Sequence, residues 1–190
     1  MARPSPAEVL RFIAENESFE RTLAAFPDLG LDDLRGLLRA VARAAVQREA
    51  EARGIDTSRL RVFCDGAARG NPGPAGAGAV LYTPDGRLVE RLGRYLGRQT
   101  NNHAEYQGLI LGLERALELG AREVEVYADS ELMVRQLLGE YRVRAEGLLP
   151  LWRRARELLA RFDRARIAHV PRERNAEADE MSNRAIDERM

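Results

Sequence analysis

Residues 61–88 read RVFCDGAARGNPGPAGAGAVLYTPDGRL, in which apolar runs are separated by turns rich in glycine and proline. An apolar run over residues 60–67, bounded by glycine, predicts a β-strand. A second apolar run covers residues 76–83, and the Pro-Asp-Gly turn at residues 84–86 separates it from a third over residues 87–96. The stretch therefore predicts a meander of three strands.

The remainder of the chain alternates between helical and extended patterns. We expect helices over residues 102–120, 130–138, 148–162 and 176–188, and strands over residues 124–128 and 166–170. The order is βββαβααβα, which predicts an α/β domain over residues 59–190.

The segment before this domain has a different texture. Residues 1–58 contain no strand-like run, and their apolar spacing predicts helices. We expect the first over residues 9–13, a second that ends before Pro27, and a third that ends at Gly54. The sequence thus predicts a small all-α N-terminal module.

The composition restricts the class of protein. The 30 Lys+Arg residues are all arginine, and they balance 30 Asp+Glu. A content of 45% hydrophobic and 32% charged residues indicates a globular chain, and no apolar run approaches the ~18 residues of a membrane span. The single cysteine, Cys64, excludes an internal disulfide and a Cys-based zinc cluster. We expect a cytoplasmic protein without a membrane partner, and a net charge of zero at first argues against nucleic acid.

One carboxylate stands out on local grounds. Asp65 follows Val62-Phe63-Cys64 inside an apolar strand, where aspartate is depleted and an unpaired buried charge is costly. An aspartate at a strand end that accepts hydrogen bonds from the glycine turn is the alternative. We favour a metal-binding or strong hydrogen-bonding role.

Three other carboxylates have ordinary local explanations. Glu105 would complete a capping box with Asn102, and that interpretation is the better one locally. Asp129 could cap a helix or place a ligand group at a strand end, and the two are equally consistent. Asp179 complements the dipole of the last helix.

As a set, these contexts resemble type 1 ribonuclease H. The matching segments are DGAARGNPGPAGAG (65–78), TNNHAEYQGL (100–109), YADSELMVRQL (127–137) and HVPRERNAEADEMSNRAID (169–187). The resemblance covers about residues 60–188 and implies the ribonuclease H-like fold, a five-stranded mixed sheet with helices on both faces. It places Asp65, Glu105, Asp129 and Asp179 at the catalytic, metal-binding carboxylate positions.

The resemblance also implies a reaction. It predicts a metal-dependent endonuclease that cleaves the RNA strand of RNA–DNA hybrids to 5′-phosphate and 3′-hydroxyl ends. Two Mg²⁺ ions, with Mn²⁺ as the alternative, suit hard carboxylate ligands and phosphodiester hydrolysis. The alternatives are a nuclease of the same fold that acts on another nucleic acid, or a non-catalytic adaptor that acts through the N-terminal helices.

Further site residues follow from the same resemblance. Substrate contacts are implied for Gly66, Asn71, Thr100, Asn101, Asn102, Glu131, Arg172 and Asn175. His169 stands where some family members place a histidine that assists proton transfer or product release. Packing at the sheet edge explains His169 equally well, and Arg172 competes with it for the catalytic role.

The N-terminal module has a sequence pattern of its own. LAAFPDLGLDDLRGLL (23–38) resembles the helix-turn-helix half of small antitoxin-like bacterial domains. Residues 1–60 hold 9 Arg and 10 acids, a net −1 that does not favour phosphate binding, so a homodimer or protein partner is at least as consistent as hybrid binding.

Residues 61–190 hold 21 Arg and 20 acids; without the four metal-assigned acids the balance is 21 − 16 = +5. Overall neutrality therefore does not exclude a metal-loaded nuclease.

Overall fold

The computed structural model describes residue 13, residues 18–52 and residues 54–190. The chain divides into two compact units, Met1–Glu49 and Ala50–Met190, and each is described by itself. The helix predicted over residues 9–13 lies, apart from Ile13, outside the described residues.

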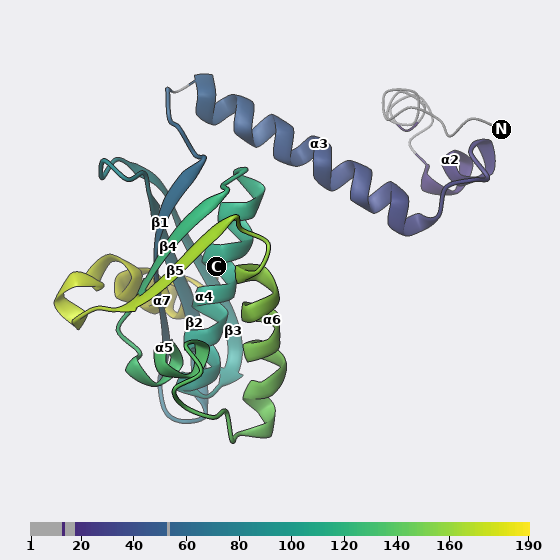
Figure 1. The fold of residues 1–190 in the computed structure, drawn as a ribbon. Coiled ribbons are helices and arrows are strands. Elements are labelled where there is room, and N and C mark those ends of the chain that lie inside the picture. The colour runs from purple at the N-terminus through teal and green to yellow at the C-terminus, as the bar shows by residue number, and fades with distance from the viewer. Residues whose placement is uncertain (1–12, 14–17, 53) are drawn as a thin grey trace. The chain divides into compact units, whose positions relative to one another are not determined.

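Two helices are described toward the N-terminus (Figure 1). α2 spans Phe19–Ala25, and its N-cap Ser18 accepts a hydrogen bond from the Arg21 backbone N–H at 3.3 Å. α3 spans Leu31–Ala52, and Gly54 follows it with a φ of 66°, a left-handed conformation that favours glycine. The predictions of a helix before Pro27 and of a helix stop at Gly54 are confirmed.

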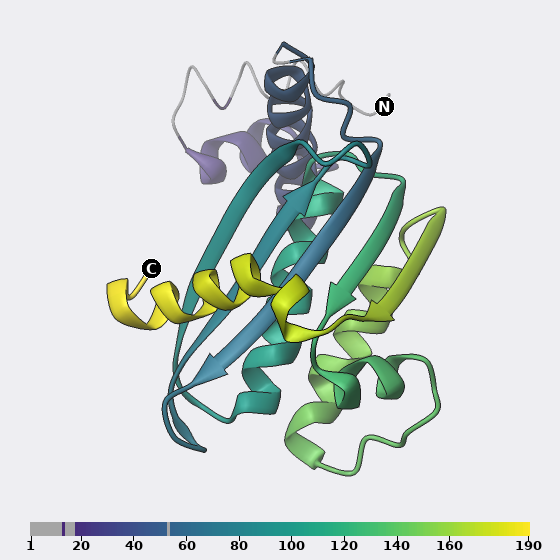
Figure 2. The same ribbon diagram turned by 90° about the vertical axis from the view of Figure 1, so that its left-hand side faces the viewer.

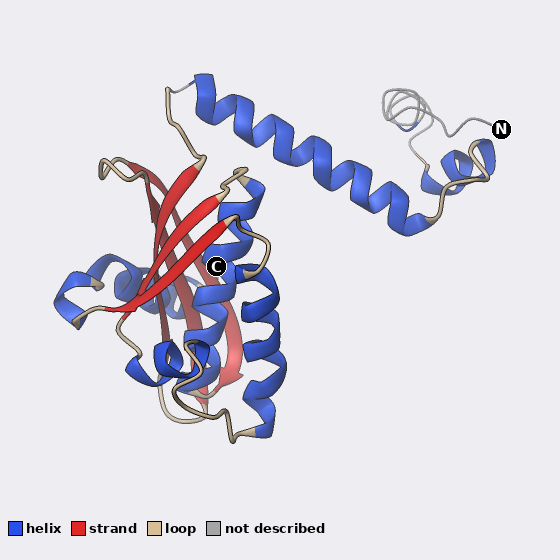
Figure 3. Cartoon of the chain, in the orientation of Figure 1, coloured by secondary structure: helices blue, strands red, loops and turns tan. Residues whose placement is uncertain are grey.

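Five strands form one mixed sheet (Figure 3). The strands are β1 Arg59–Ala68, β2 Gly73–Tyr82, β3 Leu88–Gln99, β4 Glu123–Ala128 and β5 Arg164–His169. Their order across the sheet is β3-β2-β1-β4-β5. The meander pairs antiparallel, whereas β1–β4 and β4–β5 are parallel. The predicted five-stranded mixed sheet is confirmed.

Helices cover both faces of this sheet. They are α4 Asn101–Glu118, α5 Glu131–Leu137, α6 Leu149–Leu159 and α7 Ala176–Glu188, with short 3-10 turns at Glu146–Leu148 and Arg172–Arg174. α4 packs on β1 and β2 and against α6, whereas α7 packs on β1, β2 and β3. Figure 2 shows α7 crossing one face of the sheet while α4 lies behind the other. The predicted order βββαβααβα is confirmed, and the carboxylate-bearing elements meet around β1.

Glycine allows the helices to approach the strands at two decisive places. A Cβ on Gly66 would lie 2.0 Å from the backbone nitrogen of Glu105, so the start of α4 rests directly on β1. A Cβ on Gly78 would lie 2.4 Å from the backbone oxygen of Ala178, so α7 rests directly on β2. These close approaches position the first turn of α4 and the middle of α7 next to Asp65.

Among the described residues, none of the helices combines the length and the hydropathy that a membrane-spanning segment needs.

Candidate active site

Three acidic side chains from three elements converge beside the end of β1. Asp65 lies on β1, Glu105 in the first turns of α4, and Asp129 directly after β4. Oxygens from the three carboxylates lie within 4.8 Å of one another. β1 and β4 are parallel neighbours that pair Cys64 with Ala128. The residues that follow this pair, Asp65 and Asp129, therefore lie at the same edge of the sheet. The three acids are therefore brought together by strand pairing and by the close approach of α4.

Burial makes the charged form of these groups costly. Glu105 is 8% exposed, and burial, followed by the charges of Asp65 and Asp129, raises its pKa from 4.5 to about 9. Burial is also the main reason that the pKa of Asp65 rises from 3.8 to about 6; the charges of Asp129 and Asp179 add to it, and a hydrogen bond from Ser182 opposes it. Bringing several carboxylates so close is electrostatically unfavourable without a cation.

The residues present fit a divalent metal ion. The Oε2 atom of Glu105 is buried and has no hydrogen-bond partner among the described residues. A buried acceptor of this kind is normally satisfied, because leaving it unpaired costs free energy. Three carboxylates with an unsatisfied oxygen are a donor set of the hard type that Mg²⁺ and Mn²⁺ prefer. The cluster is therefore suited to hold a divalent cation.

The fourth predicted acid, Asp179, lies outside this three-carboxylate group. Its Oδ1 accepts a hydrogen bond from the Arg172 guanidinium at 2.5 Å, and its Oδ2 accepts one from Asn183 Nδ2 at 3.3 Å. Asp179 still contributes to the raised pKa of Asp65, so its charge acts on the cluster. The structure thus joins three of the four predicted carboxylates and places the fourth beside them, in an ion pair with Arg172.

The local explanation of Glu105 as half of a capping box is wrong. The N-cap of α4 is Thr100, whose hydroxyl accepts from the His103 backbone N–H at 3.3 Å. Asn102 consequently lies inside the helix, two residues after the N-cap position. Glu105 is left without a capping role, and its buried carboxylate points to another use.

Asn175 and Ser182 support the cluster from the last helix. Asn175 occupies the N-cap position of α7 but makes no side-chain cap hydrogen bond. Its Nδ2 instead donates to Oδ1 of Asp129 at 2.9 Å and to the backbone oxygen of Cys64 at 3.0 Å. The hydroxyl of Ser182, which sequence reasoning missed, donates to Oδ2 of Asp65 at 2.5 Å. The only sequence signal was its position three residues after Asp179 on the same helix.

Several predicted substrate residues gather at the start of α4. Asn71, in the turn between β1 and β2, accepts a hydrogen bond at its Oδ1 from the Asn101 backbone N–H at 3.2 Å. The Asn101 side chain donates weakly to Glu105 Oε1 at 3.5 Å, and Asn102 is exposed beside it. This arrangement ties the glycine-rich turn to the helix that carries Glu105. The exposed amides form a polar rim next to the carboxylates.

The remaining predicted site residues are Glu131, His169 and Arg172. Glu131 forms an exposed ion pair with Arg135 at 2.7 Å. His169 is exposed at the end of β5, and its side chain makes no hydrogen bond or ion pair with any described residue. Of the two competing candidates, only Arg172 contacts an acid of the site.

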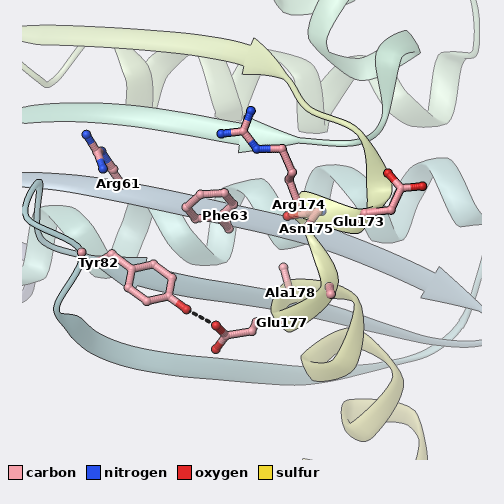
Figure 4. A pocket seen from close by; sticks show the side chains of 10 residues that line it. Arg61, Phe63, Tyr82, Glu173, Arg174, Asn175, Glu177 and Ala178 are labelled. Atoms are coloured by element: carbon pink, nitrogen blue, oxygen red, sulfur yellow. Dashed lines mark hydrogen bonds between the residues drawn. The ribbon is translucent and has the colours of Figure 1, made fainter.

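A cavity of about 390 Å³ adjoins the site on the α7 side of the sheet (Figure 4). Phe63 and Tyr82 supply its aromatic wall, and their rings meet edge-on with centroids 5.8 Å apart. The Tyr82 hydroxyl donates to Glu177, while Arg174 lines the cavity from the 3-10 turn before α7. Asn175 borders both the cavity and the carboxylate cluster.

A five-stranded sheet ordered β3-β2-β1-β4-β5, with acids converging from β1, the first long helix and β4, defines a protein of the ribonuclease H-like class. Comparisons with known proteins agree. The family model described as "Reverse transcriptase-like" matches residues 63–185. Ribonuclease HI of Halobacterium salinarum is 45% identical over 130 residues, which are 68% of this chain and 65% of that protein.

Solved structures give the same result. The crystal structure of RNase H1 from Halobacterium salinarum aligns with a TM-score of 0.67 and 45% identity, covering 68% of this chain and 98% of that one. LC11-RNase H1, solved in complex with an RNA/DNA hybrid, aligns with a TM-score of 0.64 and 40% identity, covering 68% and 97%. The chain belongs to the type 1 ribonuclease H family. It spans about two thirds of the halobacterial relative's length.

Proposed function

We propose that this protein is a metal-dependent endonuclease that hydrolyses the RNA strand of RNA–DNA hybrids, leaving 5′-phosphate and 3′-hydroxyl ends. The observation that carries the proposal is the cluster of Asp65, Glu105 and Asp129, in which Asp65 and Glu105 are buried and Asp129 is half-buried. The family relationship supports it, as does the hybrid bound to the similar LC11-RNase H1.

The three clustered carboxylates would hold the metal. We propose Mg²⁺, with Mn²⁺ as a substitute, and two ions per site, the second reached by Asp179. When bound, such ions supply an activated water and stabilise the leaving oxygen of the phosphodiester.

The surrounding side chains would bind and orient the hybrid. Asn71, Asn101 and Asn102 lie at the rim of the cluster, where exposed amides can contact sugar and phosphate groups. Recognition of RNA requires contact with the 2′-hydroxyl, which is the group that distinguishes RNA from DNA. We assign the contact with the 2′-hydroxyl to the backbone at Glu105 and to the side-chain amides at the rim of the cluster.

The test is a cleavage assay on a labelled RNA–DNA hybrid with Mg²⁺ and with EDTA. Asp65→Asn removes the charge of a central ligand at nearly constant volume, so it should abolish Mg²⁺-dependent cleavage while the fold is retained. Full activity in that variant refutes the assignment. A parallel panel of duplex RNA and duplex DNA decides whether the substrate is another nucleic acid.

A further inference from the structure

Close packing of α7 on the sheet brings Ser182 to the carboxylate cluster. Gly78 is the β2 partner of Asp65, and a Cβ on Gly78 would lie 2.5 Å from the backbone nitrogen of Ser182. A Cβ on Gly76 would lie 2.3 Å from the Ser182 backbone oxygen. Because neither glycine has a side chain, the α7 backbone lies directly on β2, and the Ser182 hydroxyl reaches β1.

The hydroxyl of Ser182 has a defined acceptor. Ser182 is completely buried, and its Oγ donates to Oδ2 of Asp65 at 2.5 Å. The same Oγ lies 2.9 Å from the backbone oxygen of Asp179. A hydroxyl carries one proton, and a carboxylate is the stronger acceptor when it is ionised. The proton therefore points to Asp65, and the bond ties β1 to the helix that carries Asp179.

Asp65 needs such a restraint because it faces two other acids. Its side chain lies against Glu105 and Asp129, whose charges repel it whenever the groups are ionised. A carboxylate free to rotate would move away from this repulsion and lose its orientation toward a shared cation. Asp129 has an equivalent restraint, since Asn175 donates to it at 2.9 Å.

We propose that Ser182 is a positioning residue for the metal site: its hydrogen bond to Oδ2 fixes the orientation of Asp65 and thereby sets the affinity of the cluster for a divalent cation. The inference rests on the proposed function only in requiring that the cluster bind such a cation. Loss of a hydrogen bond that orients a metal ligand weakens metal binding roughly 10–100-fold.

The experiment measures binding of Mn²⁺ to the 190-residue chain, free of substrate, by calorimetry and by the electron paramagnetic resonance signal of unbound Mn²⁺. Ser182→Ala should weaken Mn²⁺ binding by roughly 10–100-fold. The Mg²⁺ concentration for half-maximal hybrid cleavage should rise by a similar factor, while kcat at saturating Mg²⁺ stays close to that of the wild type. Ser182→Cys keeps a weak donor and should fall between the two.

Thr57→Val is the matched control. Thr57 is also buried, and its hydroxyl donates to the backbone oxygen of Leu119 at 2.7 Å. Leu119 caps the end of α4, whereas Glu105 lies near its start, so the lost hydrogen bond is remote from the cluster. Thr57→Val should lower the free energy of unfolding but leave Mn²⁺ affinity unchanged.

Each outcome of these measurements supports or overturns the proposed role of Ser182. Unchanged Mn²⁺ affinity in Ser182→Ala, or an equal loss in Thr57→Val, overturns the proposal. If Ser182→Ala fails to fold, Ser182→Cys decides by the same criterion. A wild type that binds Mn²⁺ but cleaves no hybrid refutes the proposed function and leaves the role of Ser182 standing, whereas a wild type that binds no Mn²⁺ refutes both.

Discussion

Replacing Glu105 by glutamine should stabilise the metal-free protein. Glu105 is buried, and burial together with the charges of Asp65 and Asp129 raises its pKa from 4.5 to about 9. In the unfolded chain the carboxyl ionises near its ordinary value, so raising the pH favours unfolding. The stability that comes from this group is fully present below pH 4.5 and is lost as the pH rises toward about 9.

The size of the effect follows from the same shift. At pH 7 the unfolded carboxyl lies 7 − 4.5 = 2.5 units above its pKa, while the folded one remains protonated. At about 1.36 kcal/mol per unit, the cost to the folded state is about 3 kcal/mol. Glutamine carries no titratable group, so Glu105→Gln removes this cost and keeps a similar shape.

The assay is urea unfolding followed by circular dichroism, in EDTA, at pH 4.5, 7 and 8. Glu105→Gln should exceed the wild type in unfolding free energy by about 3 kcal/mol at pH 7, with no gain at pH 4.5. Mg²⁺ should reverse the order, because only the wild type has the complete ligand set. Glu118→Gln, an exposed change at the far end of α4, is the control and should follow the wild type. Equal pH dependence in Glu105→Gln and the wild type would refute the reasoning.

Three further results are expected. Gly66→Ala should destabilise the protein by about 1–3 kcal/mol in thermal unfolding, because the new methyl group would meet the α4 backbone at 2.0 Å; a neutral result would contradict the close approach. Arg172→Ala should lower kcat on a hybrid more than His169→Ala does, since only Arg172 contacts Asp179, and the reverse ranking would favour the histidine. Arg172 is 74% exposed, so its loss should change stability by less than about 1 kcal/mol. Deleting residues 1–49 should leave a folded unit that cleaves hybrids, checked by gel filtration and KM; a changed oligomeric state would assign dimerisation to the deleted helices.

Local patterns predicted most of the architecture. The glycine-bounded apolar runs and the Pro-Asp-Gly turn predicted the meander, and helical spacing predicted the last helix with the same bounds, Ala176–Glu188. These features depend on neighbours within a few residues, so periodicity and turn chemistry suffice. Asp65 was also recognisable locally, because a lone aspartate in an apolar strand is unusual.

The local prediction for Glu105 was wrong. A capping box was the natural interpretation, yet the N-cap is Thr100, two residues before Asn102, and no local rule distinguishes the two caps. Asp129 and Asp179 had equally ordinary explanations. Only their joint resemblance to a family singled them out.

By itself, therefore, the sequence determined which elements form, the family to which the chain belongs and which carboxylates are candidates. Tertiary structure alone decided that Asp65, Glu105 and Asp129 meet within 4.8 Å and that Ser182 supports Asp65. The physical reason is that these contacts join residues up to 117 positions apart. Their distances are set by strand pairing and by helices resting on glycines, neither of which is written in any short stretch of the chain.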